Sequence, residues 1–429
     1  MTDSSQHRGR FRLPAALLGI LTVAAVIALA IIQPWAPSPT KSPEAPAAAD
    51  STDGLGSAAD PPPVMPDEPA ATTRMGERER LFGDITPKSI TSNRHGTLLA
   101  SNMMYSHSIT VFDAETRTSR DLSDSVDLTE LGVDGFPGIT KGAPVESAWT
   151  ADGRYAYVSQ YTLYGEGAGR AGNDKCLDRE QIRNSVLLRY DTEKHAWDQA
   201  IEVGRVPKYV EISPDGRTAL VSNWCDSTIS VVDLERGEET AQIPVDAAPR
   251  GIVILPDNRT AYATAMYADE LYRLDIESGT SEFVMKTGRK PRHLTLSPDG
   301  SRMYLTLSGA DRLLALDPAT GEVVDETRTG REPRSMTISA DGTALYVVNY
   351  YENTVSKFDA ATLEELQREP VGTRPIGVAY EQTTGTVWVA NYAGSVDVFD
   401  DTLSAEEAEE TEEADEDHAS DAPASDGGR

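Results

Sequence analysis

The sequence has few of the residues that usually hold cofactors and metals. Its 429 residues include only two cysteines and six histidines, too few thiolates for an all-cysteine zinc site or a disulfide framework. It contains no C-x-x-C-H, H-E-x-x-H, P-loop or G-x-S-x-G motif, so the common signatures of haem, zinc, nucleotide and serine-hydrolase sites are missing. We therefore predict no cofactor and no metal.

Basic residues are also in deficit. The chain has 39 lysines and arginines against 69 aspartates and glutamates, a net charge of −30. Nucleic acid and anionic membrane surfaces attract basic proteins, so this balance argues against a nucleic-acid partner.

One long segment has no charge at all. Leu13–Ile32 is apolar over twenty positions, and at 1.5 Å per residue such a helix is about 30 Å long, the thickness of a bilayer core. Arg8, Arg10 and Arg12 precede it, and the next basic residue is Lys41. By the positive-inside rule, we predict a cytoplasmic arm over 1–12 and a transmembrane signal anchor over 13–32, with the remainder outside the cell membrane. A cleaved signal peptide stays open as the alternative.

Two further segments lack the composition of a packed domain. Residues 33–74 contain ten of the 26 prolines among Ala, Ser and Thr, which predicts an extended linker. Residues 404–429 contain a run of acidic residues with no basic residue before the last position, which predicts an acidic disordered tail.

The middle of the chain is a repeat with a period of 42. Its strongest marker is a proline, found as Pro207, Pro249, Pro291, Pro333 and Pro375. Each proline opens an apolar strand, a turn such as Asp-Gly, a second strand, a loop and a third strand that ends in aspartate, followed by a fourth strand. Pro144 and Pro87 open two earlier units that carry insertions. Seven four-stranded units of this length predict an all-β fold, a seven-bladed β-propeller of antiparallel blades over 75–403, preceded by the one transmembrane helix.

The last unit ends after its third strand. The segment Glu77–Pro87 resembles the ends of the other fourth strands. We therefore expect it to pair with the seventh blade and close the ring, which would remove an exposed sheet edge.

The second strands carry a recurring motif. They end in YVVN at Asn349, WVAN at Asn391, LVSN at Asn223 and YVSQ at Gln160. This pattern resembles the YVTN-repeat β-propellers of bacterial and archaeal envelope and periplasmic proteins. The resemblance implies the propeller fold, and it implies relatives that include both binding proteins and lactonase-like enzymes.

Basic residues recur beside the repeat proline, in the links that a propeller brings together around its axis. This set comprises Lys88, Lys208, Arg250, Lys290, Arg292, Arg334 and Arg374. Aromatic residues recur directly after the YVTN-like motif, namely Tyr161, Trp224, Tyr350 and Tyr392. Arginine and lysine suit carboxylate or phosphate, and aromatic rims are common where sugars or peptides dock. Ion pairing between blades and packing between loops are the structural alternatives for these two sets.

The two cysteines are expected to meet. Cys176 lies in an insertion of the second unit, Tyr161–Arg183, and Cys225 lies in a loop of the third unit on the same face. Outside the membrane this favours a disulfide that fixes the insertion, although two free thiols remain the alternative.

These observations favour a membrane-anchored, extracytoplasmic binding or scaffold module over an enzyme. Its expected partner is an envelope polymer, an anionic small ligand or a protein. The alternative is a lactonase-like hydrolase or lyase with its site in the centre of the ring. His293 and Glu211 are then the acid/base candidates, although neither has a partner that can be identified from sequence.

Overall fold

A computed structural model describes residues 68–404. The predicted cytoplasmic arm, membrane span and acidic tail, and most of the linker, lie outside this range. Within it, no helix has both the length and the apolar character needed to cross a membrane, and the helical structure there consists of the short 3-10 turn η1, Arg179–Gln181.

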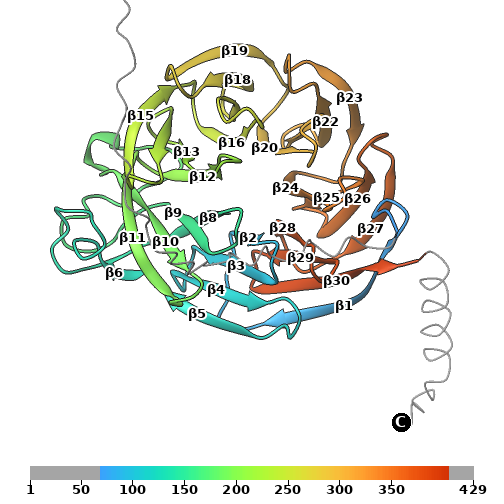
Figure 1. The fold of residues 1–429 in the computed structure, drawn as a ribbon, viewed down its shortest axis with the longest axis horizontal. Helices are drawn as coiled ribbons and strands as arrows, with labels where there is room; N and C mark the ends of the chain where they lie inside the picture. The colour runs from blue at the N-terminus through green and yellow to red at the C-terminus, as the bar shows by residue number, and fades with distance from the viewer. Residues whose placement is uncertain (1–67, 405–429) are drawn as a thin grey trace, which may run out of the picture. The chain divides into compact units, whose positions relative to one another are not determined.

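Seven four-stranded antiparallel sheets form a ring around a central axis (Figure 1). The strands of each blade are called a to d from the axis outward. Blade 1 contains β2 (Ser89–Ser92), β3 (Thr97–Asn102), β4 (Ser108–Asp113) and β5 (Ser119–Ser123). Blade 2 contains β8 (Pro144–Trp149), β9 (Tyr155–Gln160), β10 (Ser185–Asp191) and β11 (Ala196–Val203). Blade 3 contains β12 (Pro207–Ile212), β13 (Thr218–Asn223), β14 (Thr228–Asp233) and β15 (Glu238–Pro244).

The next three blades keep the same order. Blade 4 contains β16 (Pro249–Ile254), β17 (Thr260–Ala265), β18 (Glu270–Asp275) and β19 (Thr280–Lys286). Blade 5 contains β20 (Pro291–Leu296), β21 (Met303–Leu307), β22 (Arg312–Leu316) and β23 (Val323–Arg328). Blade 6 contains β24 (Pro333–Ile338), β25 (Ala344–Asn349), β26 (Thr354–Asp359) and β27 (Glu365–Pro370). The predicted seven-bladed, all-β architecture is confirmed.

Blade 7 is assembled from the two ends of the described chain. It contains β28 (Pro375–Glu381), β29 (Thr386–Asn391), β30 (Ser395–Leu403) and, as its outer strand, β1 (Arg74–Phe82). Phe82 lies opposite Ser395, and Arg74 lies opposite Leu403. The predicted ring closure is confirmed. The pairing strand begins before the predicted segment Glu77–Pro87 and ends at Phe82, so that residues 83–87 form the link into blade 1.

Both predicted insertions lie around blade 2. The first forms a separate hairpin between blades 1 and 2, made of β6 (Ser125–Asp127) and β7 (Ile139–Lys141). The second, Tyr161–Arg183, connects β9 to β10, and we call it the flap. A cluster of buried side chains that includes Leu128, Phe136 and Leu163 holds the hairpin and the flap against blade 2.

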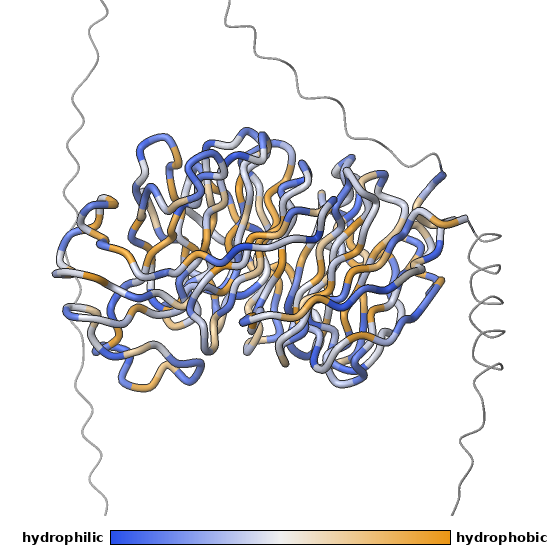
Figure 2. Tube along the Cα trace, turned by 90° about the horizontal axis from the view of Figure 1, so that it is seen from below, coloured by the Kyte–Doolittle hydropathy of each residue, from blue (hydrophilic) through white to orange (hydrophobic). Residues whose placement is uncertain are grey.

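The core lies between neighbouring sheets. For example, Leu220 and Ile229 of blade 3 pack against Ile252 and Ala261 of blade 4. Apolar positions run through the interior of the ring, and polar residues gather in the turns at its two faces (Figure 2). Each sheet packs against a neighbour on both of its faces, which accounts for the continuous burial along middle strands such as β17 and β25.

The recurring turn residues have the predicted structural roles. Gly216, Asn258, Gly300 and Gly342 occupy the turn between strands a and b with positive φ, which is why Gly or Asn stands there. Asp359 at the end of β26 accepts hydrogen bonds from the backbone N–H groups of Ala361 and Thr362 at 2.9 and 2.7 Å. The repeated aspartates are therefore turn-capping residues.

The motif asparagine ties strand b to strand c. The Asn349 Nδ2 donates to Thr354 Oγ1 at 3.0 Å and to Ser356 Oγ at 2.8 Å. A glycine three residues before the repeat proline of the same blade packs directly on this amide. A Cβ on Gly330 would lie 2.5 Å from Asn349 Cγ, so only glycine fits there. This contact explains the glycine that recurs near the end of the fourth strands.

Candidate functional site on the axis

One face of the ring carries the b–c loops and the d–a links, and we call it the mouth face. The residue after strand b donates its N–H to the carbonyl of the residue before the repeat proline, as in Tyr350 to Glu332 at 3.2 Å and Tyr392 to Arg374 at 2.9 Å. This bond recurs at Tyr161, Met266 and Ser308. It fixes each aromatic position beside the basic position of the same blade.

Five of the seven predicted basic residues form one group at the start of the inner strands. We call them the cation cluster, and they are Lys88, Lys208, Arg250, Arg292 and Arg334. Lys208, Arg250 and Arg292 are buried, while Lys88 and Arg334 are half-buried. Burial lowers the pKa of Lys88 far below its usual value, and the charges of Arg292, Lys208, Arg250 and Arg334 lower it further. All five residues follow the repeat proline at the start of an innermost strand, so the ring brings their like charges together around the axis.

The other two predicted basic residues lie outside the cluster. Lys290 and Arg374 are exposed, and they stand immediately before the repeat proline with φ of 55° and 60°. The left-handed backbone at this position is shared by Val206, Ala248 and Glu332. The position before the proline therefore differs structurally from the position after it, although both looked equivalent in the sequence.

Each aromatic site residue contacts a cation. The Lys208 Nζ lies 4.3 Å from the ring centroid of Tyr161 and 4.9 Å from that of Trp224. The Arg334 guanidinium lies 3.9 Å from the ring centroid of Tyr350, and the Lys88 Nζ lies 5.4 Å from that of Tyr392. Tyr161, Trp224 and Tyr350 are buried by these contacts and by their loops. They support the cations, whereas the exposed rings of this face are Tyr105, Tyr267 and Tyr351.

The cations differ in their acidic partners. Lys208 pairs with Asp174 of the flap at 2.5 Å, and Arg334 pairs with Glu332. Lys88, Arg250 and Arg292 form no ion pair within residues 68–404. The Arg292 Nε donates to the Arg334 carbonyl at 3.0 Å. Buried charges are normally paired, whereas the charge of Glu146 reaches Lys88, Arg250 and Arg292 without forming an ion pair with any of them.

Next to the cations lies a group of half-buried polar residues, and two of these were the acid/base candidates. His293 of blade 5 contacts blades 3 and 6, with Nε2 3.4 Å from the Tyr209 hydroxyl and Nδ1 3.2 Å from the Ser335 hydroxyl. Burial, together with Arg250 and Arg292, lowers the pKa of His293 to about 3. The imidazole is therefore neutral at ordinary pH and is a weak base.

The acidic members of this group have the opposite shift. Burial raises the pKa of Glu211 to about 8, with a further contribution from Glu146, although Arg94 opposes it. Burial also raises the pKa of Glu146 to about 7 against the opposing charge of Arg250. The structure thus gives His293 and Glu211 the neighbours that the sequence did not reveal. Carboxyls with pKa values near neutrality can exchange protons at physiological pH.

Three residues of this region were missed from the sequence. Glu146 and Tyr209 each stand two positions after a repeat proline, in the register of His293, so an alignment of the repeats would have found them. Asp174 lies in the flap, which has no counterpart in the other blades, and no sequence signal placed it beside Lys208.

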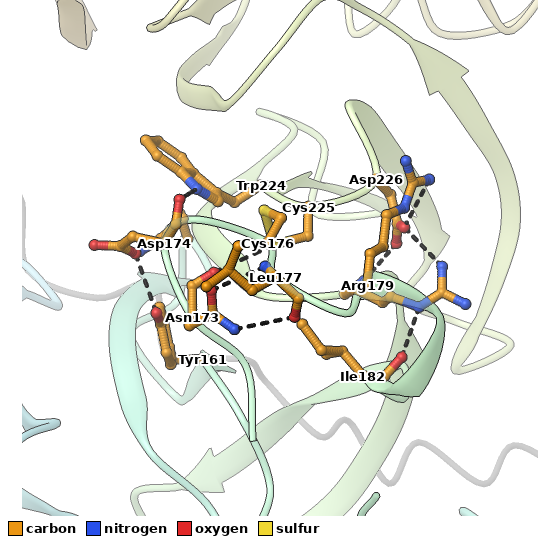
Figure 3. The surroundings of a disulfide bond; sticks show 12 residues. Tyr161, Asn173, Asp174, Cys176, Leu177, Arg179, Ile182, Trp224, Cys225 and Asp226 are labelled. Atoms are coloured by element: carbon orange, nitrogen blue, oxygen red, sulfur yellow. Dashed lines mark hydrogen bonds and ion pairs between the residues drawn. A yellow bond between two sulfur atoms is a disulfide. The ribbon is translucent and has the colours of Figure 1, made fainter. Parts of the chain in front are cut away.

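The predicted disulfide between Cys176 and Cys225 is present. It holds the flap against the b–c loop of blade 3 (Figure 3). On one side of the bridge, the Trp224 Nε1 donates to the Asp174 carbonyl at 2.9 Å. On the other side, Arg179 lies 3.3 Å from Asp226, which also pairs with Arg205 at 2.8 Å. The flap is therefore anchored on both sides of the bridge.

One hollow of the surface lies away from this site. A hollow of about 360 Å³ lies at the outer side of blades 2 and 3 and is lined by Gly132–Asp134, Ala200–Glu202 and Gly237–Glu239. No group of three or more potential metal ligands occurs within the described range.

Fold and site together define a seven-bladed β-propeller with a cationic centre. Two family models match parts of the chain, the YNCE-like beta-propeller over residues 190–347 and the lactonase, 7-bladed beta-propeller, over residues 312–426. The resemblance to the YVTN-type propellers is thereby confirmed.

Solved structures share the fold at low sequence identity. Hydrazine synthase of Kuenenia stuttgartiensis is 21% identical, with a TM-score of 0.57 over 74% of this chain and 96% of that one. A chain in the crystal structure of the mitotic checkpoint complex is 12% identical, with a TM-score of 0.59 over 83% of this chain and 96% of that one. No curated protein matches the sequence. At these identities the solved structures support the fold alone.

Proposed function

We propose that the propeller is a binding module that takes an anionic group of its ligand at the cation cluster. The observation that carries this proposal is that Lys88, Arg250 and Arg292 form no ion pair in the described part of the chain. Keeping like charges together under partial burial is unfavourable. A bound carboxylate, sulfate or phosphate would supply the missing counter-charge through charge-assisted hydrogen bonds.

The surroundings of the cluster favour an anionic carbohydrate of the cell envelope over a protein partner. Tyr105, Tyr267 and Tyr351 are exposed on the same face, and tyrosine rings offer apolar area together with a hydroxyl. A net charge of −30 on the whole chain disfavours general binding of anions, so a cluster of cations is a local exception. Local attraction of this kind gives specificity in binding.

The proposal also includes a location. A single N-terminal span over 13–32, with its N-terminus in the cytoplasm, would place the propeller outside the cell membrane. The disulfide supports an oxidising compartment. Protease accessibility of the propeller in intact cells would test this orientation.

Binding of an oligogalacturonate to the full chain, measured by calorimetry, tests the proposal. Arg250→Gln combined with Arg292→Gln removes two unpaired charges, and each lost charge-assisted contact is worth about 1.5–3 kcal/mol. We expect at least a hundredfold loss of affinity, and we expect the wild-type affinity to fall as salt is added. The matched control is Arg259→Gln, whose partners Asp275 and Glu277 are far from the axis in blade 4. Equal binding by both variants would refute the proposal, and no binding by the wild type to any anionic sugar would favour a protein partner.

A lactonase-like hydrolase is the second candidate. The family match over 312–426 supports it, as do two carboxyls, Glu146 and Glu211, with pKa values near neutrality. In this alternative an ionised carboxyl accepts a proton from the water that attacks the lactone carbonyl, and Arg250 stabilises the developing oxyanion. The acyl C–O bond of the ring then breaks, and the carboxyl returns the proton to the leaving ring oxygen. Hydrolysis of a sugar lactone that is lost in Glu146→Gln and Glu211→Gln would support the enzyme. Absence of hydrolysis with intact ligand binding would reject it.

A further inference from the structure

The flap places a carboxylate of the protein on one member of the cation cluster. We propose that Asp174 is a built-in competitor for the anionic ligand and determines which anions the cluster accepts. This inference rests on the proposed function, because it concerns the same site.

The Asp174 carboxylate covers the buried Lys208 ammonium, and we call this carboxylate the cap. The Asp174 carboxylate lies 2.5 Å from the Lys208 Nζ, and its side chain is 61% exposed while that of Lys208 is 6% exposed. The lysine therefore lies beneath the carboxylate, and a ligand that approaches from solvent meets Asp174 first. The Tyr161 hydroxyl donates to the same carboxylate oxygen at 3.1 Å, which holds the carboxylate in place (Figure 3).

The disulfide keeps the cap at high effective concentration. Cys176 is two residues from Asp174, and Cys225 adjoins Trp224, whose indole binds the Asp174 carbonyl at 2.9 Å. Such a tether holds Asp174 close to Lys208, so a ligand that displaces the carboxylate loses part of its binding free energy. Mild acid would not release the cap. Although burial opposes it, Lys208 lowers the pKa of Asp174 to about 2, and the carboxylate stays ionised.

The cap divides the cluster into two parts. Arg334 is paired with Glu332 and Lys208 with Asp174, whereas Lys88, Arg250 and Arg292 form no ion pair within residues 68–404. The charge of Asp174 also reaches Lys88 and Arg250, but without an ion pair. A ligand with a single anionic group can therefore use the three cations without an ion pair and leave the Asp174–Lys208 pair in place. A densely charged ligand gains the contact with Lys208 only by displacing Asp174. The cap therefore selects for sparsely charged anions and against densely charged ones.

A comparison of two probes on the full chain tests this inference. Oligogalacturonate carries one negative charge per sugar. It is compared with a heparin-derived oligosaccharide of equal length, which carries more than one negative charge per sugar on average. Asp174→Asn keeps the size and the acceptor oxygen but removes the charge. We expect it to bind the heparin oligosaccharide about tenfold tighter and to change oligogalacturonate binding by less than threefold. Asp178→Asn is the matched control, because this flap carboxylate pairs with Arg170 and does not contact the cluster.

Two further variants separate displacement of the cap from long-range repulsion. If Asp174 caps Lys208, Lys208→Gln weakens heparin-oligosaccharide binding more in the Asp174→Asn background than in the wild type. Cys176→Ser with Cys225→Ser should reproduce part of the Asp174→Asn gain, and the two changes together should gain less than their sum.

The outcomes distinguish the two proposals. The first outcome is that Asp174→Asn binds the heparin oligosaccharide no more tightly than the wild type does, while Arg250→Gln with Arg292→Gln still abolishes binding. This outcome would refute the role of Asp174 as a competitor and leave the proposed binding site intact. A gain of equal size in Asp178→Asn also overturns this role, because general charge would then be the cause. Binding that is indifferent to Arg250 and Arg292 overturns the proposed function itself.

Discussion

Replacing Lys357 by methionine removes the charge that balances a fully buried carboxylate. Lys357 of blade 6 and Asp401 at the end of blade 7 are both 0% exposed, with Nζ 2.6 Å from the carboxylate. The Lys357 Nζ also donates to the carbonyl of Thr73 at 2.8 Å, and the Tyr346 hydroxyl donates to Asp401. The group therefore joins blade 6, blade 7 and the segment that leads into β1.

The cost of this change can be estimated from the burial. Removing one partner of a buried ion pair costs about 3–5 kcal/mol, because the other charge stays unpaired. With about 2.1 cal/mol/K of unfolding entropy per residue over the 337 residues from 68 to 404, a cost of 4 kcal/mol lowers Tm by about 6 °C. Replacing both Lys357 and Asp401 by apolar residues should recover much of this loss.

Thermal unfolding by calorimetry at pH 7 and pH 4 is the assay. Burial raises the pKa of Asp401 even with Lys357 present, and loss of the lysine raises it further. A carboxyl whose pKa is raised on folding destabilises the protein as pH rises above the unfolded value, so the deficit of Lys357→Met should be smaller at pH 4. The control is Arg236→Met, whose side chain is 65% exposed beside Glu238, itself 51% exposed, and which should cost less than 1 kcal/mol. A loss for Lys357→Met no larger than that of the control would refute the reasoning.

Three further changes have defined outcomes. Gly372→Ala places a Cβ 2.6 Å from Asn391 Cγ and 2.8 Å from Ser395 Oγ, and it should lower the free energy of unfolding, measured by chemical denaturation, by about 1–3 kcal/mol. The control Gly83→Ala, whose Cβ would have nothing closer than 4.0 Å, should be near neutral. Equal effects of the two changes would contradict the packing of glycine on the motif asparagine. Glu211→Gln should stabilise the protein at pH 9 more than at pH 5. The folded-state pKa of Glu211 is raised to about 8, so the wild type loses stability as pH rises above the pKa of this group in the unfolded state. Melting curves with no pH-dependent difference between the two proteins would argue against the raised pKa. Cys176→Ser with Cys225→Ser opens a loop with a sequence separation of 49 and should lower the free energy of unfolding by about 4 kcal/mol, and an unchanged Tm would show that other contacts already fix the flap.

The repeat made the fold predictable from sequence. The proline spacing predicted the blades, and the missing fourth strand of the last unit predicted the ring closure by β1. The insertion of the second unit, with Cys176 in it and Cys225 in the neighbouring loop, predicted the disulfide. All of these depend on local patterns that recur at a fixed period, and each recurrence strengthens the others.

The candidate site was only partly predictable. The positions of Lys88, Lys208, Arg250, Arg292 and Arg334 follow from the repeat, but the exclusion of Lys290 and Arg374 depends on a left-handed backbone before the proline, which the sequence does not mark. The pairing of Asp174 with Lys208 and of Lys357 with Asp401 joins residues from different blades. Such contacts depend on how sheets pack, and periodicity within one blade carries no information about them.

The closure in blade 7 also determines at which face of the ring the described chain begins and ends. Arg74 lies opposite Leu403, and Phe82 lies opposite Ser395, the residue that follows the b–c loop of that blade. The described chain therefore enters and leaves the ring side by side at the face away from the cation cluster. Residues 68 and 404, the two ends of the described range, therefore lie away from the mouth face, so the strand that closes the ring does so without laying a chain end across the cluster.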